Sequence, residues 1–74
     1  MKKAAIIIDK WKLSIFERHL REAKREFTVK PGITDDTLTI IALYDGDTPG
    51  DMQALGGVVR RANAEAAATP PHVP

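Results

Sequence analysis

The sequence contains no cysteine and a single serine, Ser14. Without cysteine, neither a disulfide framework nor a thiolate zinc site can stabilise a chain of this size. Ser14 lacks the histidine spacing of a hydrolase, and its position suits a helix cap. His19 and His72 do not have the spacing of a metal site, and we interpret His19 as structural. We therefore expect no metal, no cofactor and no enzymatic activity.

Long apolar runs and glycine-rich phosphate loops are also missing. The apolar run at residues 4–8 follows two lysines but is interrupted by Asp9, so it is too short for a signal sequence or a membrane span. No G-x-G-x-x-G or Walker-type loop indicates a nucleotide. We expect a soluble protein of the cytoplasm that does not contact a membrane.

Charge is balanced overall but unevenly distributed. The formal net charge is +1, yet residues 1–30 hold nine lysines and arginines against four acids, whereas residues 31–74 hold two arginines against six acids. Such a dipolar domain can attract an acidic partner or another copy of itself.

Residues 37–44 (TLTIIALY) form the longest β-type run, and Gly, Pro and Asp clusters border it on both sides. Residues 4–8 and 26–30 predict two more strands, the second with Phe27 and Val29 on one buried face. The Pro31-Gly32 pair predicts a turn with Gly32 at positive φ.

Two helices are predicted. Ser14 and Glu17 form a capping box that begins a helix over residues 15–25, with its core stripe at Phe16, Leu20 and Ala23. Thr48, with Pro49 after it, predicts the cap of a second helix that runs to residue 68. Its predicted core stripe is Met52, Leu55, Val59, Ala62 and Ala66.

Gly56-Gly57 interrupts this second helical pattern. Close packing against the sheet or the other helix is the favoured interpretation, and a local break is the alternative. Residues 1–68 then make one α+β domain, and residues 69–74 a disordered, proline-rich tail.

The order β-α-β-β-α predicts a split βαβ arrangement, similar to a ferredoxin-type fold that lacks its fourth strand. A right-handed crossover makes residues 4–8 and 26–30 parallel, with residues 37–44 between them. Both helices then cover one face of the three-stranded sheet. Leu38, Ile40, Ala42 and Tyr44 would face the helices.

The other face of this sheet would be left bare. Ile7, Ile41 and Leu43 would form an apolar patch there, next to the open edge of residues 4–8. Clusters of this kind mark interfaces, so we predict self-association through the sheet as a homodimer, or capture of a strand or helix of another protein.

Three further features allow two interpretations each. Asp45 to Asp51 begins like a calcium loop, but Pro49 and Gly56 stand where ligands belong, so we favour a capping role. Trp11, between Lys10 and Lys12, either closes the core or has a binding role, as an anchor for a protein partner or a stacking platform for an unpaired base. Arg18, Arg21 and Arg25 form a basic stripe diluted by glutamates, which suits a solvated face better than a binding site.

Residues 4–13 (AAIIIDKWKL), 15–20 (IFERHL) and 31–38 (PGITDDTL) resemble a group of small uncharacterised proteins of tailed bacteriophages and prophages. The resemblance extends over most of residues 4–66 and implies an accessory protein made in the bacterial cytoplasm that binds and redirects a host protein. It assigns no catalytic residue.

The function predicted from the sequence is thus a non-enzymatic homodimer that modulates or inhibits a bacterial protein. Lys10, Trp11, Lys12, Arg18, Arg21 and Arg25 are the predicted partner-binding residues, and Ile7, Ile41 and Leu43 the predicted self-association residues. The alternative is a small nucleic-acid-binding regulator that uses the same basic residues, whose affinity would fall steeply with salt.

Overall fold

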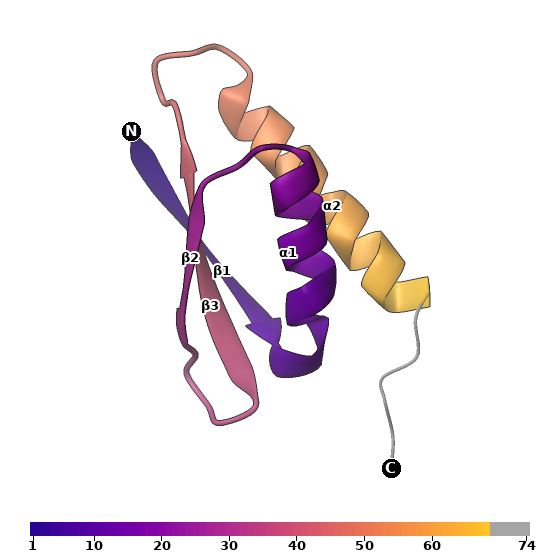
Figure 1. Cartoon of the computed structure of the whole chain (residues 1–74). Helices are drawn as coiled ribbons and strands as arrows, with labels where there is room; N and C mark the ends of the chain where they lie inside the picture. Colours follow the sequence, from indigo (N-terminus) through magenta and orange to yellow (C-terminus); the bar gives the residue numbers. More distant parts are fainter. Residues whose placement is uncertain (69–74) are drawn as a thin grey trace.

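The predicted order of elements is confirmed in a computed structural model, which describes residues 1–68 (Figure 1). The predicted tail at residues 69–74 lies outside the described residues. The elements are β1 (Lys2–Asp9), the 3-10 helix η1 (Lys10–Lys12), α1 (Leu13–Glu22), β2 (Phe27–Pro31), β3 (Thr37–Tyr44) and α2 (Asp51–Ala68).

The sheet has the predicted topology, with β3 in the centre and the order β1-β3-β2. Both outer strands are antiparallel to β3, so β1 and β2 run parallel to each other. Ile40 of β3 lies opposite Ile6 of β1 and Val29 of β2. The apolar run of residues 37–44 forms the central strand. In that place a neighbouring strand pairs with each of its edges and the helices cover one of its faces, which suits a segment this apolar.

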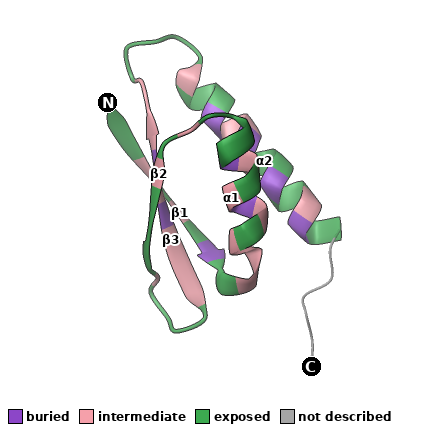
Figure 2. Ribbon diagram, in the orientation of Figure 1, coloured by how far each residue is buried: buried purple, intermediate pink, exposed green. Residues whose placement is uncertain are grey.

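Both helices pack on one face of the sheet, as predicted, and the core lies between them and β3 (Figure 2). Ile40 and Ala42 are fully buried there, while Leu38 and Tyr44 are partly buried against the same cluster. The helices contribute Phe16, Leu20, Leu55, Val58, Ala62 and Ala66 to the buried residues.

The boundaries of α1 differ from the prediction. The helix begins at Leu13 directly after η1, so Ser14 lies inside its first turn, and the N-terminal cap, Lys12, makes no side-chain hydrogen bond. The predicted capping box is wrong. The helix also ends three residues early, because Lys24 adopts a positive φ of 56°.

This C-terminal end is a Schellman motif. The Arg25 amide donates to the Leu20 carbonyl and the Lys24 amide donates to the Arg21 carbonyl, both at 2.9 Å. Ala23 is the last, non-helical residue before this turn and is exposed, so its predicted place in the core stripe is wrong.

The start of α2 also differs from the prediction. Gly50, at a φ of 85°, separates Thr48 from the helix, which begins at Asp51. The Thr48 hydroxyl donates to the Asp45 carboxylate and therefore stabilises the preceding loop, not the helix end. Met52, the second residue of α2, is 61% exposed, so its predicted place in the core stripe is wrong, and Val58 takes a buried position that the predicted stripe had left out.

The turn after β2 needs glycine for a reason that the sequence did not indicate. Pro31 is the last residue of β2, and Gly32 does not have the predicted positive φ. A Cβ atom on Gly32 would instead overlap the Thr37 side chain and carbonyl group. Close approach of the two chain segments fixes this residue as glycine.

Gly56 and Gly57 lie in continuous helix, and neither predicted explanation applies to them. The nearest atom to a Cβ built on Gly57 is an Arg61 guanidinium nitrogen at 3.5 Å, an ordinary contact with a flexible side chain. We expect Gly57→Ala to raise the free energy of unfolding by about 1 kcal/mol, because alanine restricts the unfolded chain more than glycine does. Urea unfolding measures this change, and a loss of stability would contradict the contacts described.

Candidate functional site: the open face of the sheet

The open face is the side of the sheet that the helices leave uncovered. Side chains of a strand alternate between faces, so residues with odd numbers in β1 and β3 and residues with even numbers in β2 point to this side. The pairing arranges them in three rows across the sheet. The rows are Lys3–Leu43–Glu26, Ala5–Ile41–Thr28 and Ile7–Thr39–Lys30.

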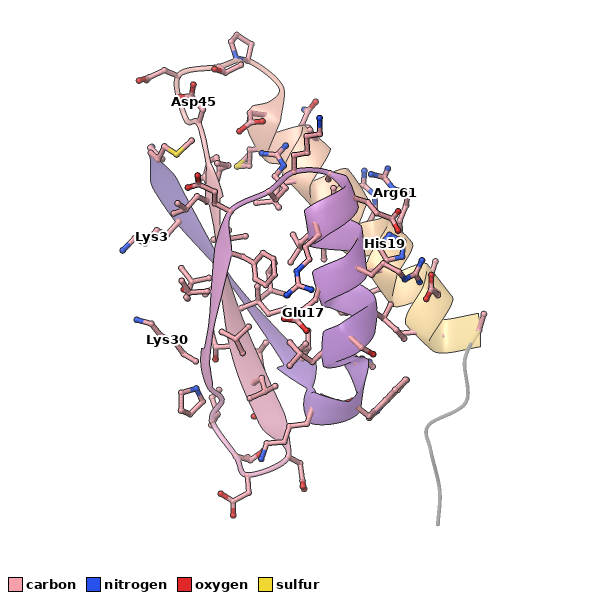
Figure 3. The ribbon with its side chains drawn as sticks, in the orientation of Figure 1. Lys3, Glu17, His19, Lys30, Asp45 and Arg61 are labelled. Carbon is pink, nitrogen blue, oxygen red and sulfur yellow. The ribbon has the colours of Figure 1, made fainter. Side chains whose placement is uncertain are left out.

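The centre of the open face is apolar and its corners are charged. A shallow depression of about 490 Å³ lies over it, with Ile41 and Leu43 at its centre and Lys3, Glu26 and Lys30 at its rim. Lys3 and Lys30 point away from the helices (Figure 3). The face therefore combines an apolar centre with charges of both signs at its border, as protein interfaces do.

All three predicted self-association residues lie on this face. Ile7 is 53% exposed, and Ile41 and Leu43 are half-buried between their neighbours on β1 and β2. The charged residues of the same face were not among the predicted site residues. Phe27 packs against the core, whereas Val29, predicted on the same buried face, is 38% exposed. The alternation that put these two residues on one face also put Glu26, Thr28 and Lys30 on the opposite face, so the signal was present.

The outer edge of β1 is a second uncovered feature. The Lys10 amide donates to the Asp36 carbonyl in continuation of the β1–β3 ladder. This hydrogen bond shows which residues of β1 direct their backbone groups towards β3. Residues with even numbers therefore bond to β3, while the backbone groups of Lys3, Ala5 and Ile7 point outward. Within residues 1–68 no strand pairs with this edge.

An apolar groove of about 220 Å³ lies between this edge and α2. It is lined by Ala4, Ile6, Met52, Leu55, Gly56 and Val59. Among residues 1–68 no strand covers this groove, and Met52 at its border is 61% exposed.

Three of the predicted partner-binding residues are held by carboxylates of the same chain. Arg18 binds Glu65 on α2 and lies 3.7 Å from Glu22. Arg21 lies 3.4 Å from Glu17, and Arg25 donates to Asp51. Arg18 and Arg25 therefore join α1 and its C-terminal turn to α2.

Histidine 19 belongs to the same contact between the helices. Its Nε2 lies 3.1 Å from Glu65 Oε1, on the side of α1 that faces α2 (Figure 3). Hydrogen bonds from Arg18 and then from His19 hold the pKa of the Glu65 carboxyl below its ordinary value. The arrangement supports a structural role for His19.

The residues around Trp11 are less constrained. Trp11 is half-buried in η1, at the end of the sheet, with the Lys12 ammonium 5.5 Å from the centre of its ring. Lys12 also lies 3.6 Å from Asp9, whereas Lys10 is exposed. Partner binding by Lys10, Trp11 and Lys12 remains a prediction.

The loop at residues 45–51 uses its carboxylates for its own backbone and side chains. Asp45 accepts from the Asp47 amide at 2.9 Å and from the Thr48 hydroxyl. Asp51 accepts from the Asp45 amide at 2.7 Å and from Arg25. Hydrogen bonds explain these residues without a cation.

The Arg25–Asp51 pair predicts how stability depends on pH. The two side chains are only 15% and 21% exposed and approach to 2.9 Å. The hydrogen bond from Arg25, followed by the one from the Asp45 amide, lowers the pKa of the Asp51 carboxyl from its ordinary 3.8. The ionised carboxylate is therefore favoured in the folded state. Its contribution to stability is fully present above the ordinary pKa of 3.8 and is lost as the pH falls through the lower pKa of the folded state.

We expect the free energy of unfolding of the wild type, measured with urea, to fall more steeply below about pH 4 than that of Asp51→Asn. The variant has no carboxyl group at this position to protonate. Equal slopes for the two proteins between pH 5 and about pH 2 would contradict a contribution from this pair.

Within residues 1–68, no helix combines the length and apolar character that crossing a lipid bilayer requires. Comparison with protein-family models, with curated proteins and with solved structures gives no match to this chain. Function must therefore be argued from the chain's own surfaces.

Proposed function

We propose that this chain is a non-enzymatic protein-binding module that forms a homodimer through the open face. The dimer would bind a bacterial protein in the cytoplasm and modulate or inhibit it. The bacterial partner rests on the sequence resemblance to small phage proteins, whereas the homodimer rests on the physical features of the open face.

The observation that carries the proposal is the apolar centre of the open face. Ile7, Ile41 and Leu43 lie together on a sheet face with no covering element in the described part of the chain. Exposed apolar clusters on a sheet mark association surfaces. A domain of 74 residues without disulfides also has a core small enough to benefit from association.

A dimer joined in this way keeps η1 accessible, because η1 lies at the end of the sheet. Lys10, Trp11 and Lys12 are then our primary candidates for contact with the bacterial partner, with Trp11 as the anchor. Arg18, Arg21 and Arg25 are secondary candidates because each pairs with a carboxylate more closely than Lys12 pairs with Asp9, at 3.6 Å. This pairing also favours a protein partner over nucleic acid, which requires free cations.

The mass of the wild type in solution tests the proposal. Sedimentation velocity over a range of concentrations is expected to give a species of twice the 8.1 kDa chain mass. A mass of one chain at every concentration would contradict the homodimer.

A further inference from the structure

We propose that the two copies meet with their two-fold axis parallel to β3, and that Lys3 and Glu26 select this orientation. The inference rests on the proposed homodimer and identifies the residues that determine its geometry. It follows from the three rows of the open face, in which Lys3 and Glu26 occupy opposite ends of the same row.

Stacked sheets lie about 10 Å apart, with their strands within about 30° of each other. A two-fold axis parallel to β3 keeps each row opposite the same row of the partner and exchanges β1 with β2. Leu43 then lies opposite the partner's Leu43, and Ile41 opposite the partner's Ile41. The apolar centre of one copy is thus covered by the apolar centre of the other.

The same operation places Lys3 opposite the partner's Glu26, and Glu26 opposite the partner's Lys3. Two pairs of opposite charge therefore border the apolar centre, one on each side. A lysine side chain is long enough to adapt to the rotation between the sheets. Lys30 faces the partner's Ile7 and lies diagonally across from the partner's Asp9, so no like charges are brought together.

The alternative orientation is less complementary. A two-fold axis across the strands reverses the order of the rows and keeps β1 opposite the partner's β1. Depending on where this axis crosses the strands, Leu43 then lies against the partner's Ile41, Thr39 or Thr37. This orientation also removes Glu26 from the partner's Lys3. The two charge pairs would then be lost in every register, and the loss of these pairs is what makes this orientation less favourable.

Reversal of charge tests the orientation. Lys3→Glu sets two glutamates against each other on both sides of the interface, and Glu26→Lys does the same with two lysines. We expect each single variant to raise the dissociation constant of the dimer by roughly 10- to 100-fold, because two exposed attractive pairs become repulsive. The double variant, with the charges exchanged, is expected to recover the wild-type constant.

Mixing the two single variants is the sharper test. In a heterodimer of Lys3→Glu with Glu26→Lys, each facing pair combines opposite charges, so the mixture is expected to dimerise at a concentration at which each variant alone is monomeric. Native mass spectrometry with one variant labelled with ¹⁵N identifies the heterodimer by its intermediate mass. Lys2→Glu, which changes the same charge on the other face of β1, is the matched control and should stay dimeric.

The possible failures can be told apart. A monomeric wild type would overturn the proposed homodimer itself. A dimeric wild type whose single variants both remain dimeric, or whose mixture gives no heterodimer, would overturn only the orientation. Loss of the dimer in Lys3→Glu but not in Glu26→Lys would overturn the proposed orientation. It would favour edge-to-edge pairing of β1 with the partner's β1, in which Lys3 meets the partner's Asp9.

Discussion

The Phe16→Ala variant is expected to lose a large part of its stability at 25 °C. Phe16 is among the largest fully buried side chains and connects α1 to the central strand. Truncation of a buried phenylalanine costs about 3–5 kcal/mol through lost burial and the cavity that remains. A domain of this length has a total stability of roughly 4–11 kcal/mol, so this loss is between about a quarter and all of it.

Circular dichroism and urea unfolding measure this effect. Phe16→Leu, which keeps most of the apolar volume, should remain folded and lose clearly less stability than the alanine variant. Alanine at Ile33, which is 81% exposed, should have almost no effect. A cooperative and nearly unchanged unfolding curve for Phe16→Ala would contradict the described core.

The Ile41→Asp variant is expected to fold normally and to be monomeric. Ile41 points to the open face and lies outside the buried core, so a carboxylate there does not enter the space between sheet and helices. In the dimer, however, the two carboxylates would face each other in the apolar centre. Burial of unpaired charges is strongly unfavourable, and we expect the dissociation constant to rise by roughly 100-fold or more.

The matched control is Ile33→Asp, which introduces the same charge on an exposed isoleucine of the β2–β3 loop, away from the rows of the open face. Light scattering should give one chain mass for Ile41→Asp and two for Ile33→Asp, with unchanged circular dichroism for both. A dimeric Ile41→Asp would exclude the open face as the interface. An unfolded Ile41→Asp would show that Ile41 serves the core.

The sheet could be predicted from the sequence because its signals are local. The apolar run at residues 37–44 and the Gly, Pro and Asp clusters around it determine which strand is central, and chain connectivity then limits where residues 4–8 and 26–30 can pair. Alternation along β3 also gave the faces correctly, since Ile40 and Ala42 are buried.

The helix ends could not be predicted in the same way. Ser14 and Thr48 have the composition of caps, but η1 precedes α1 without a break and Gly50 delays the start of α2. The Schellman motif at Lys24 uses a lysine where glycine is usual, so composition gave no sign of it. These ends depend on the path of the neighbouring chain and not on propensity alone.

The candidate site divides similarly. The apolar members of the open face follow from strand alternation, whereas the pairing of Arg18 with Glu65 and of Arg25 with Asp51 joins residues far apart in the sequence. The sequence therefore indicated a basic stripe on one helix, whereas in the fold Arg18 and Arg25 of this stripe are paired with carboxylates of α2. Which corner charges share a row also required the register of the strands.

The central claim is that the open faces of two copies cover each other. Isotope-filtered nuclear Overhauser spectroscopy on a mixture of labelled and unlabelled chains tests it most directly, because it detects only contacts between copies. We predict contacts between the methyl groups of Ile41 and Leu43 of one copy and the same residues of the other. Intermolecular contacts restricted to Met52 and Val59 of α2, or none at all, would contradict the claim.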